Sequence, residues 1–309
     1  MSRDEPASSR LRALVLGSGA GGGVPQWNCN CRVCRLAWDG DARVKPRTQS
    51  SLAVSADGRR WLLLNASIDL RQQILATPAL QPKGEGRHSP IAAVLLTNTD
   101  VDHAAGLLAL RERQPFTIWG TRATLDTIAG NRIFDVVGHD IVARRAIGLG
   151  EAFEPLPGLT VELFPVPGKV PLWLEQGEVR TDEIGEGTVG VAVEAAGRRL
   201  VYAPGSARVT DDLNKRIASA HALFFDGTLF SDDEMIANGL GDKTGRRMGH
   251  MPVSGPGGTL EELARHQTVR RILIHINNSN PILIEGSPEE AKVKAAGWEI
   301  AFDGMEVTP

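Results

Sequence analysis

The sequence lacks a charge excess, a long hydrophobic run and dispersed cysteines, and each absence excludes a class of protein. Its net charge of −3 over 309 residues provides no basic field for nucleic acid or an anionic membrane. No apolar stretch is long enough to span a membrane, and residues 1–10 lack the apolar core of a secretory signal. We therefore expect a cytoplasmic protein that acts on a small molecule or peptide, with neither nucleic acid nor membrane as a partner.

The few cysteines that are present lie together, as Cys29, Cys31 and Cys34. Their odd number and close spacing in a reducing compartment argue against a disulfide framework. The C-x-C-x-x-C spacing lets three thiolates converge on one ion, and soft sulfur ligands suit Zn²⁺. A structural zinc site would need a fourth ligand from elsewhere. The alternative is a set of free or redox-active thiols, although unprotected clustered thiols would oxidise.

Short apolar runs alternate with helical segments, which is typical of an α/β protein. Strands are predicted at 11–16, 50–56, 60–65, 91–96, 116–119, 159–165, 189–194, 199–203, 222–226, 272–276 and 298–302. Helices are predicted at 68–76, 104–110, 121–129, 211–220, 259–266 and 288–296. The two halves repeat the same order, which predicts two sheets packed face to face with helices outside. Because no composition break appears, we expect one domain over 11–309 after a flexible N-terminus at 1–10.

Two glycine-rich segments are candidates for contact with a ligand. Gly17, Gly19 and Gly22 match the dinucleotide-binding pattern G-x-G-x-x-G, but the helix that this pattern requires is not predicted after them. These glycines instead allow the backbone to approach another loop or a ligand closely. The long aperiodic segment 167–187 is either a binding loop or a solvated linker.

The segment 97–103, Thr-Asn-Thr-Asp-Val-Asp-His, follows a predicted buried strand and precedes a predicted helix. Chemistry in α/β proteins gathers at such strand ends. A simpler interpretation is a helix cap, in which Asp100 or Asp102 accepts backbone N–H groups and His103 has no role.

Five residues in loops or at strand ends are candidate metal ligands: Asp100, Asp102, His103, His250 and His275. One carboxylate and two imidazoles with open positions describe the facial triad of non-haem Fe(II) enzymes that activate O₂. The same donors could hold a hydrolytic Zn²⁺, although a dinuclear site would need more histidines.

The segment that ends in Asp102-His103 resembles the H-x-H-x-D-H motif of the metallo-β-lactamase superfamily. The chain is more similar still to the PqqB family of pyrroloquinoline quinone (PQQ) biosynthesis proteins. The similarity is carried by GGGVPQWNCNC (21–31), RTQSS (47–51), LNAS (64–67), YAPG (202–205), MGH (248–250), HINN (275–278) and FDGM (302–305). The resemblance implies a four-layer αββα sandwich with metal between the sheet edges.

This chain departs from the superfamily pattern at four ligand positions. Asn98 and Asp100 stand where the first two histidines are expected, Lys169 stands for the third-loop histidine, and Gly205 stands for the bridging aspartate. We therefore expect one metal ion held by a reduced set of ligands, and we do not expect a dinuclear hydrolytic site. We assign Lys169, Gly205 and Asn277 to substrate binding and Asp100 to a helper role, as an orienting group or base.

The position of His275 admits two interpretations. The cysteines need a fourth ligand, and related phosphodiesterases supply a histidine from this late strand end. In register with those proteins, however, His275 matches the histidine of the active centre, and Asn278 takes the structural position. If His275 serves the cysteines, His250 completes the set with Asp102 and His103.

The resemblance implies a role in making PQQ from a peptide-derived, crosslinked Glu–Tyr precursor. The donor types favour an iron- and O₂-dependent hydroxylation of the tyrosine ring. The first alternative is a non-enzymatic carrier of PQQ or its precursor toward the periplasm, and the second is a metal-dependent hydrolase. A homodimer is possible.

Overall fold

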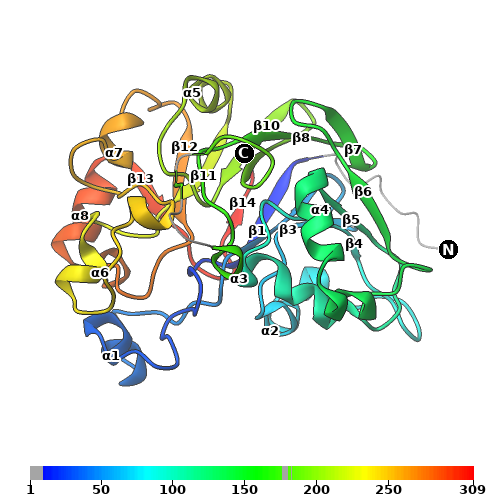
Figure 1. Ribbon diagram of the computed structural model, residues 1–309, viewed down its shortest axis with the longest axis horizontal. Coiled ribbons are helices and arrows are strands. Elements are labelled where there is room, and N and C mark those ends of the chain that lie inside the picture. The colour runs from blue at the N-terminus through cyan, green and yellow to red at the C-terminus, as the bar shows by residue number, and fades with distance from the viewer. Residues whose placement is uncertain (1–9, 176–179, 182) are drawn as a thin grey trace.

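The computed structural model describes residues 10–175, 180–181 and 183–309, and these residues form two mixed β-sheets of seven strands each. The sheets pack face to face, with helices on their outer faces (Figure 1). The expected αββα sandwich is therefore confirmed. The expected flexible N-terminus, residues 1–10, lies almost wholly outside the described residues.

The first sheet has the order β14-β1-β2-β3-β4-β5-β6, and the second has the order β13-β12-β11-β10-β9-β8-β7. The strands of the first sheet are β1 (Arg12–Gly17), β2 (Ser51–Ser55), β3 (Trp61–Leu64), β4 (Ile91–Leu95), β5 (Thr117–Gly120), β6 (Ala143–Ala146) and β14 (Glu306–Val307). Those of the second are β7 (Ala152–Leu156), β8 (Leu159–Pro165), β9 (Val189–Ala195), β10 (Arg198–Ala203), β11 (Ala222–Asp226), β12 (Arg270–Ile274) and β13 (Trp298–Ile300). The α-helices are α1 (Arg32–Trp38), α2 (Leu70–Ala76), α3 (Val101–Ala104), α4 (Arg122–Ala129), α5 (Asp211–Ala218), α6 (Glu234–Ala237), α7 (Thr259–Glu262) and α8 (Pro288–Ala295).

Three clusters of buried apolar side chains explain why the strands are continuous hydrophobic runs in the sequence. Alternate residues of one strand face opposite sides, and in β1 Ala13 and Val15 join the core between the sheets while Leu14 and Leu16 belong to the outer cluster, on the side where α2 packs against β1. The outer face of the second sheet packs against α5 and α8 through Leu213, Ile217 and Val293. Strands buried on both faces need apolar residues at every position.

The parallel strands bring the candidate residues to one edge of the sandwich. β4 runs parallel to β3 and β5, and β11 runs parallel to β10 and β12. The motif at 97–103 follows β4, while Asp226, Gly205 and His275 lie at the ends of β11, β10 and β12. Residues from the two halves of the chain therefore meet where these strands end.

Several local predictions were wrong. β6 has the sequence ARRA and β7 contains Pro155, and neither edge strand carries an apolar run that would have revealed it. The helix predicted at 259–266 ends at Glu262. The strand predicted at 272–276 ends at Ile274, so His275 lies just beyond it.

The segment 167–187 is partly structured. A 3₁₀ turn covers Leu172–Leu174, and Gly168 pairs with Glu183 in an isolated β-bridge. Residues 176–179 and 182 of this segment lie outside the described residues.

Among the described residues, no helix combines the length and the apolar character needed to cross a membrane.

Candidate metal centre

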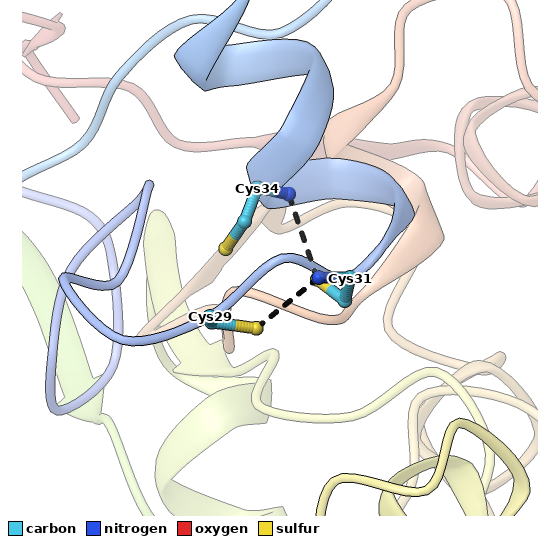
Figure 2. A group of neighbouring side chains, drawn as sticks. All are labelled: Cys29, Cys31 and Cys34. Atoms are coloured by element: carbon cyan, nitrogen blue, oxygen red, sulfur yellow. Dashed lines mark hydrogen bonds between the residues drawn. The ribbon is translucent and has the colours of Figure 1, made fainter.

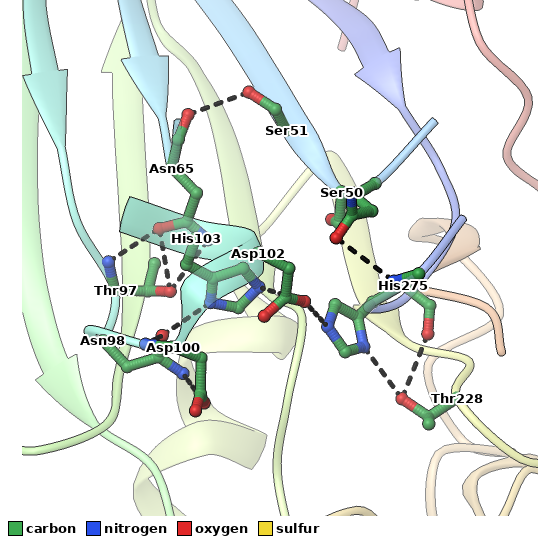
Figure 3. A network of polar contacts seen from close by, with 12 residues as sticks. Ser50, Ser51, Asn65, Thr97, Asn98, Asp100, Asp102, His103, Thr228 and His275 are labelled. Atoms are coloured by element: carbon green, nitrogen blue, oxygen red, sulfur yellow. Dashed lines mark hydrogen bonds and ion pairs between the residues drawn. The ribbon is translucent and has the colours of Figure 1, made fainter. Parts of the chain in front are cut away.

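Asp102, His103 and His275 meet at the edge between the two sheets (Figure 3). One potential ligand atom from each lies within 4.8 Å of the others. Asp102 and His103 come from the short helix α3, and His275 follows β12. The fold thus brings one carboxylate and two imidazoles together, although His275 follows His103 by 172 residues in the sequence.

His103 is oriented by the side chain of Asn98, which stands where the superfamily has a histidine. The Nδ1 atom of His103 lies 2.7 Å from Oδ1 of Asn98. Because an amide oxygen can only accept, Nδ1 carries the proton and Nε2 keeps its lone pair. Within the described residues Nε2 is buried without a hydrogen-bond partner and lies 3.8 Å from Oδ2 of Asp102. A buried lone pair beside a carboxylate fits a metal ligand.

His275 is held in a strained backbone conformation. Its φ of +60° lies in the left-handed region, which costs free energy for a residue with a side chain. The hydroxyl oxygen of Thr228 lies 3.0 Å from the carbonyl oxygen and 2.9 Å from Nδ1 of His275. Nε2 of His275 is thereby directed at Asp102, 3.2 Å from its Oδ2. The strained turn after β12 places this imidazole in the centre.

The protonation states suit a cation. Burial raises the pKa of the Asp102 carboxyl, but the adjacent imidazoles of His103 and His275 outweigh burial and hold that pKa below its ordinary value. Burial lowers the pKa of His103 further than the carboxylate of Asp102 raises it. Burial also lowers the pKa of His275, but its contacts with Asp102 raise it more. Asp102 and His103 are thus in the states that bind metal, an ionised carboxylate and a neutral imidazole, whereas His275 has to release a proton when it binds.

Asp100 does not cap α3 as the simpler interpretation required. It occupies the N-cap position, but its side chain makes no capping hydrogen bond to this helix. Its Oδ2 instead accepts from Nδ2 of Asn98 at 3.1 Å. Asp100 therefore holds the amide that orients His103.

Asp226 is a residue of the centre that the sequence analysis missed. It is fully buried, and its Oδ2 lies 2.8 Å from Nδ1 of His250 and accepts from the backbone N–H of Ser206. Its Oδ1 accepts from the backbone N–H and hydroxyl of Thr228. The signal was present, because a buried strand of the second half ends in a carboxylate. In the sequence, Asp226 stands out only as the last residue of that strand.

His250 lies beside the three clustered residues with its ring stacked on that of His275, at 5.2 Å between centroids. Since the carboxylate of Asp226 accepts from Nδ1, Nε2 of His250 keeps the lone pair. Gly205 makes room for this ring, because a Cβ at Gly205 would lie 3.2 Å from its Cε1. The glycine at the expected bridging position therefore accommodates an imidazole.

A cavity of about 320 Å³ opens over the centre. Lys169, Gly205 and Asn277, which we assigned to substrate binding, all line it together with Asp102 and His250. The glycine-rich segment also approaches the centre, since a Cβ at Gly21 would lie 3.6 Å from the Asp102 carboxyl. Of the glycines in the predicted pattern, Gly17 allows a close approach to another loop, because a Cβ there would overlap the backbone oxygen of Gln49.

The three cysteines gather at a second location (Figure 2). Cys31 is the N-cap of α1, and the backbone N–H groups of Cys31 and Cys34 face the sulfur atoms of Cys29 and Cys31 at 3.4 and 3.5 Å. The hydrogen bond from Cys31 lowers the pKa of Cys34 to about 7, despite burial. The thiol of Cys34 is thus poised to ionise, whereas its hydrogen bond with Cys34 and burial raise the pKa of Cys31, which has to lose a proton to bind a cation.

Asn278, and not His275, completes this second group. Its carbonyl oxygen lies 3.5 Å from Sγ of Cys31 and 3.9 Å from Sγ of Cys34, and its side-chain Nδ2 lies 3.2 Å from Sγ of Cys34. His275 points to Asp102 instead. The geometry thus agrees with the interpretation in which His275 belongs to the active centre.

The comparisons with known proteins agree with this architecture. Residues 60–276 match the model of the beta-lactamase superfamily domain. The chain is 61% identical to coenzyme PQQ synthesis protein B of Methylobacterium nodulans, with 96% of this chain and 99% of that protein covered. It is 55% identical to the protein of the same name from Rhizobium meliloti, over 97% of this chain and 98% of that one.

Solved structures give the same result. The crystal structure of Zn²⁺-bound PqqB from Methylobacterium extorquens has a TM-score of 0.95 and 58% identity, with 96% of this chain and 100% of that chain covered. A diphosphatase of the PhnP family, at 19% identity, TM-score 0.67 and 96% coverage of both chains, shares the fold. This chain therefore belongs to the beta-lactamase superfamily and, within it, to the family of coenzyme PQQ synthesis protein B.

Proposed function

We propose that this protein hydroxylates the tyrosine ring of a peptide-derived, crosslinked Glu–Tyr precursor during PQQ biosynthesis, with Fe²⁺ held by Asp102, His103 and His275 and with O₂ as co-substrate. The observation that carries the proposal is the donor set. Two imidazoles and one carboxylate converge, and the buried Nε2 of His103 faces them without a hydrogen-bond partner in the described residues. Fe²⁺ bound by such a triad keeps open positions and supplies the activation of O₂.

The protein's own side chains would position the iron ligands and the phenol. Asn98 and Thr228 fix the two imidazoles. Asp226 fixes His250, whose Nε2 is available to accept a proton from a phenol in the cavity. His250 therefore acts as the candidate base, and Asp226 is a positioning residue.

A second active-site metal is not part of this proposal. Both carboxylate oxygens of Asp226 accept hydrogen bonds from backbone N–H groups, and one of them also faces Nδ1 of His250. The group formed by Asp226, His250 and His275 shares His275 with the first group. The dinuclear hydrolase alternative is accordingly disfavoured.

We also propose a structural Zn²⁺ bound by Cys29, Cys31 and Cys34. The carbonyl oxygen of Asn278 faces two of the thiols and supplies the fourth position. A relative with 58% identity is described as Zn²⁺-bound. Zinc prefers thiolate ligands in closed tetrahedral sites.

The decisive experiment is anaerobic loading with Fe²⁺, followed by addition of the Glu–Tyr precursor and O₂. We expect oxygen uptake and a product heavier by one oxygen atom in mass spectrometry. Asp102→Asn should abolish both while the zinc content is kept. Binding of the precursor without oxygen uptake would instead support a carrier, and release of a hydrolysed product would support a hydrolase.

A further inference from the structure

Two lysines share one carboxylate in the wall of the active-site cavity. Nζ of Lys169 lies 2.8 Å from Oε1 of Glu175, and Nζ of Lys243 lies 3.5 Å from Oε2. The side chains of Lys169 and Glu175 are only 14% and 13% exposed, and that of Lys243 is 38% exposed. All three line the cavity that contains Asp102 and His250. The arrangement is an anion held between two ammonium groups.

The charges on this part of the wall do not balance. Burial raises the pKa of Glu175, but hydrogen bonds and charges from Lys169 and Lys243 outweigh burial, so the pKa lies below its ordinary value and the carboxylate is ionised. Two positive charges thus face one negative charge. An incoming carboxylate can take the place of Glu175 on the same two donors without a new desolvation of the lysines.

Lys169 of this pair lies beside the residue that precedes the candidate base. Gly249 has a φ of +87°, and a Cβ at this position would lie 3.3 Å from Cγ of Lys169. The next residue, His250, is held by Asp226. A ligand carboxylate on the two lysines would therefore leave the remainder of the ligand over His250 and the metal-binding residues.

We propose that Lys169 and Lys243 form a carboxylate-binding subsite and that Glu175 occupies it when no ligand is bound. The ligand class is an aromatic polycarboxylate, which rests on the function proposed above. Exchange of Glu175 for a ligand carboxylate makes the subsite selective for acids over their esters. The contacts that define the subsite include Lys243 and Glu175, which the sequence alone does not single out.

The test measures the Kd of PQQ, a tricarboxylate, and of its neutral trimethyl ester with the zinc-loaded protein in the absence of iron. Lys243→Met should weaken binding of the acid by about tenfold, because a charge-assisted contact is lost. Glu175→Gln should tighten it by about threefold, because the internal competitor loses its charge. The ester should bind all variants equally. Lys45→Met is the matched control, since Lys45 lies over Phe302, outside this cavity.

An unchanged Kd of the acid in both Lys243→Met and Glu175→Gln would overturn the subsite. Parallel shifts for acid and ester would also overturn it, because they would show a change of cavity shape. Lys243→Met keeps the test valid if Glu175→Gln fails to fold, since Lys243 is partly exposed. The Kd measurements need no turnover, so they can support or overturn the subsite whether or not the protein hydroxylates the precursor.

Discussion

At the scale of single residues, the site depends on groups that hold the imidazoles rather than on more ligands. Asn98 fixes His103, Thr228 fixes His275, and Asp226 fixes His250. A ligand that is pre-oriented loses less freedom when it binds a metal. Asn98, at the position where the superfamily motif led us to expect a histidine, is an orienting acceptor for His103.

Asp226→Asn should lower kcat for hydroxylation by roughly 10- to 100-fold, the usual cost of losing a carboxylate behind a histidine. The reason is that the neutral amide of asparagine attracts the Nδ1–H group of His250 more weakly than the carboxylate of Asp226 does. KM for the precursor and the iron content should change little, because Asp226 contacts neither in the proposed arrangement. Steady-state kinetics and metal analysis check this, and loss of iron together with kcat would show that Asp226 is a ligand instead.

Glu234 makes the stability of the protein depend on pH. Burial raises its pKa from 4.5 to about 7, although Ser279 and the backbone N–H of Phe230 donate to it. Its folded pKa lies above its unfolded value, so its contribution to stability is complete below pH 4.5 and is lost as pH rises to about 7. The free energy of unfolding should fall by up to about 3 kcal/mol over this range.

Urea unfolding at pH 5 and pH 8, compared between the natural protein and Glu234→Gln, isolates this residue. The variant lacks the titrating group, so its stability should change less between the two pH values. Equal pH dependence in both proteins would show that Glu234 is ionised in the folded state at all of these pH values.

At the scale of elements, β8 and β9 pack so closely that β9 has no room for a side chain at Gly190. Gly190 in β9 pairs with Phe164 in β8, and a Cβ at Gly190 would overlap the ring of Phe164. Gly190→Ala should therefore destabilise the protein by roughly 1–3 kcal/mol, as overpacked cores do. Gly187→Ala is the matched control, since no described atom lies within 4 Å of the added Cβ. Denaturant unfolding of both variants tests this, and equal stabilities would contradict it.

The elements with apolar runs could be predicted from the sequence, and those without could not. β8 and β11 begin and end where the pattern placed them, because β11 is apolar and buried on both faces up to its last residue and β8 alternates buried apolar residues with more exposed ones. The edge strand β6 has two arginines and no apolar run. An edge strand is paired on one side only and is not obliged to be apolar.

The same contrast holds for the candidate site. Asp102 and His103 follow a conspicuous strand and were found, whereas Asp226 is the last residue of a strand and carries no motif. The choice between the two roles of His275 needed three-dimensional contacts. Its register allowed both, and only the left-handed turn after β12 directs the ring to Asp102.

At the scale of the whole molecule, the chain carries two separate candidate metal centres. We expect one zinc ion at the cysteines and one iron ion at the active centre. Cys31→Ser should remove the zinc and lower the melting temperature by several degrees, because the free energy of binding a structural zinc ion adds to the free energy of folding. Metal analysis and thermal melting check this, with Asn30→Ser, an exposed change in the same loop, as the control. Unchanged zinc and melting temperature in Cys31→Ser would exclude a structural zinc site.

His275 and Asn278 are three residues apart, and they face different centres. Binding at the two centres is then thermodynamically reciprocal: any factor by which zinc tightens the hold on iron equals the factor by which iron tightens the hold on zinc. If zinc at the cysteines tightens the proposed iron site, removal of zinc by a chelator would loosen iron by that same factor, although zinc takes no part in the proposed oxygen chemistry.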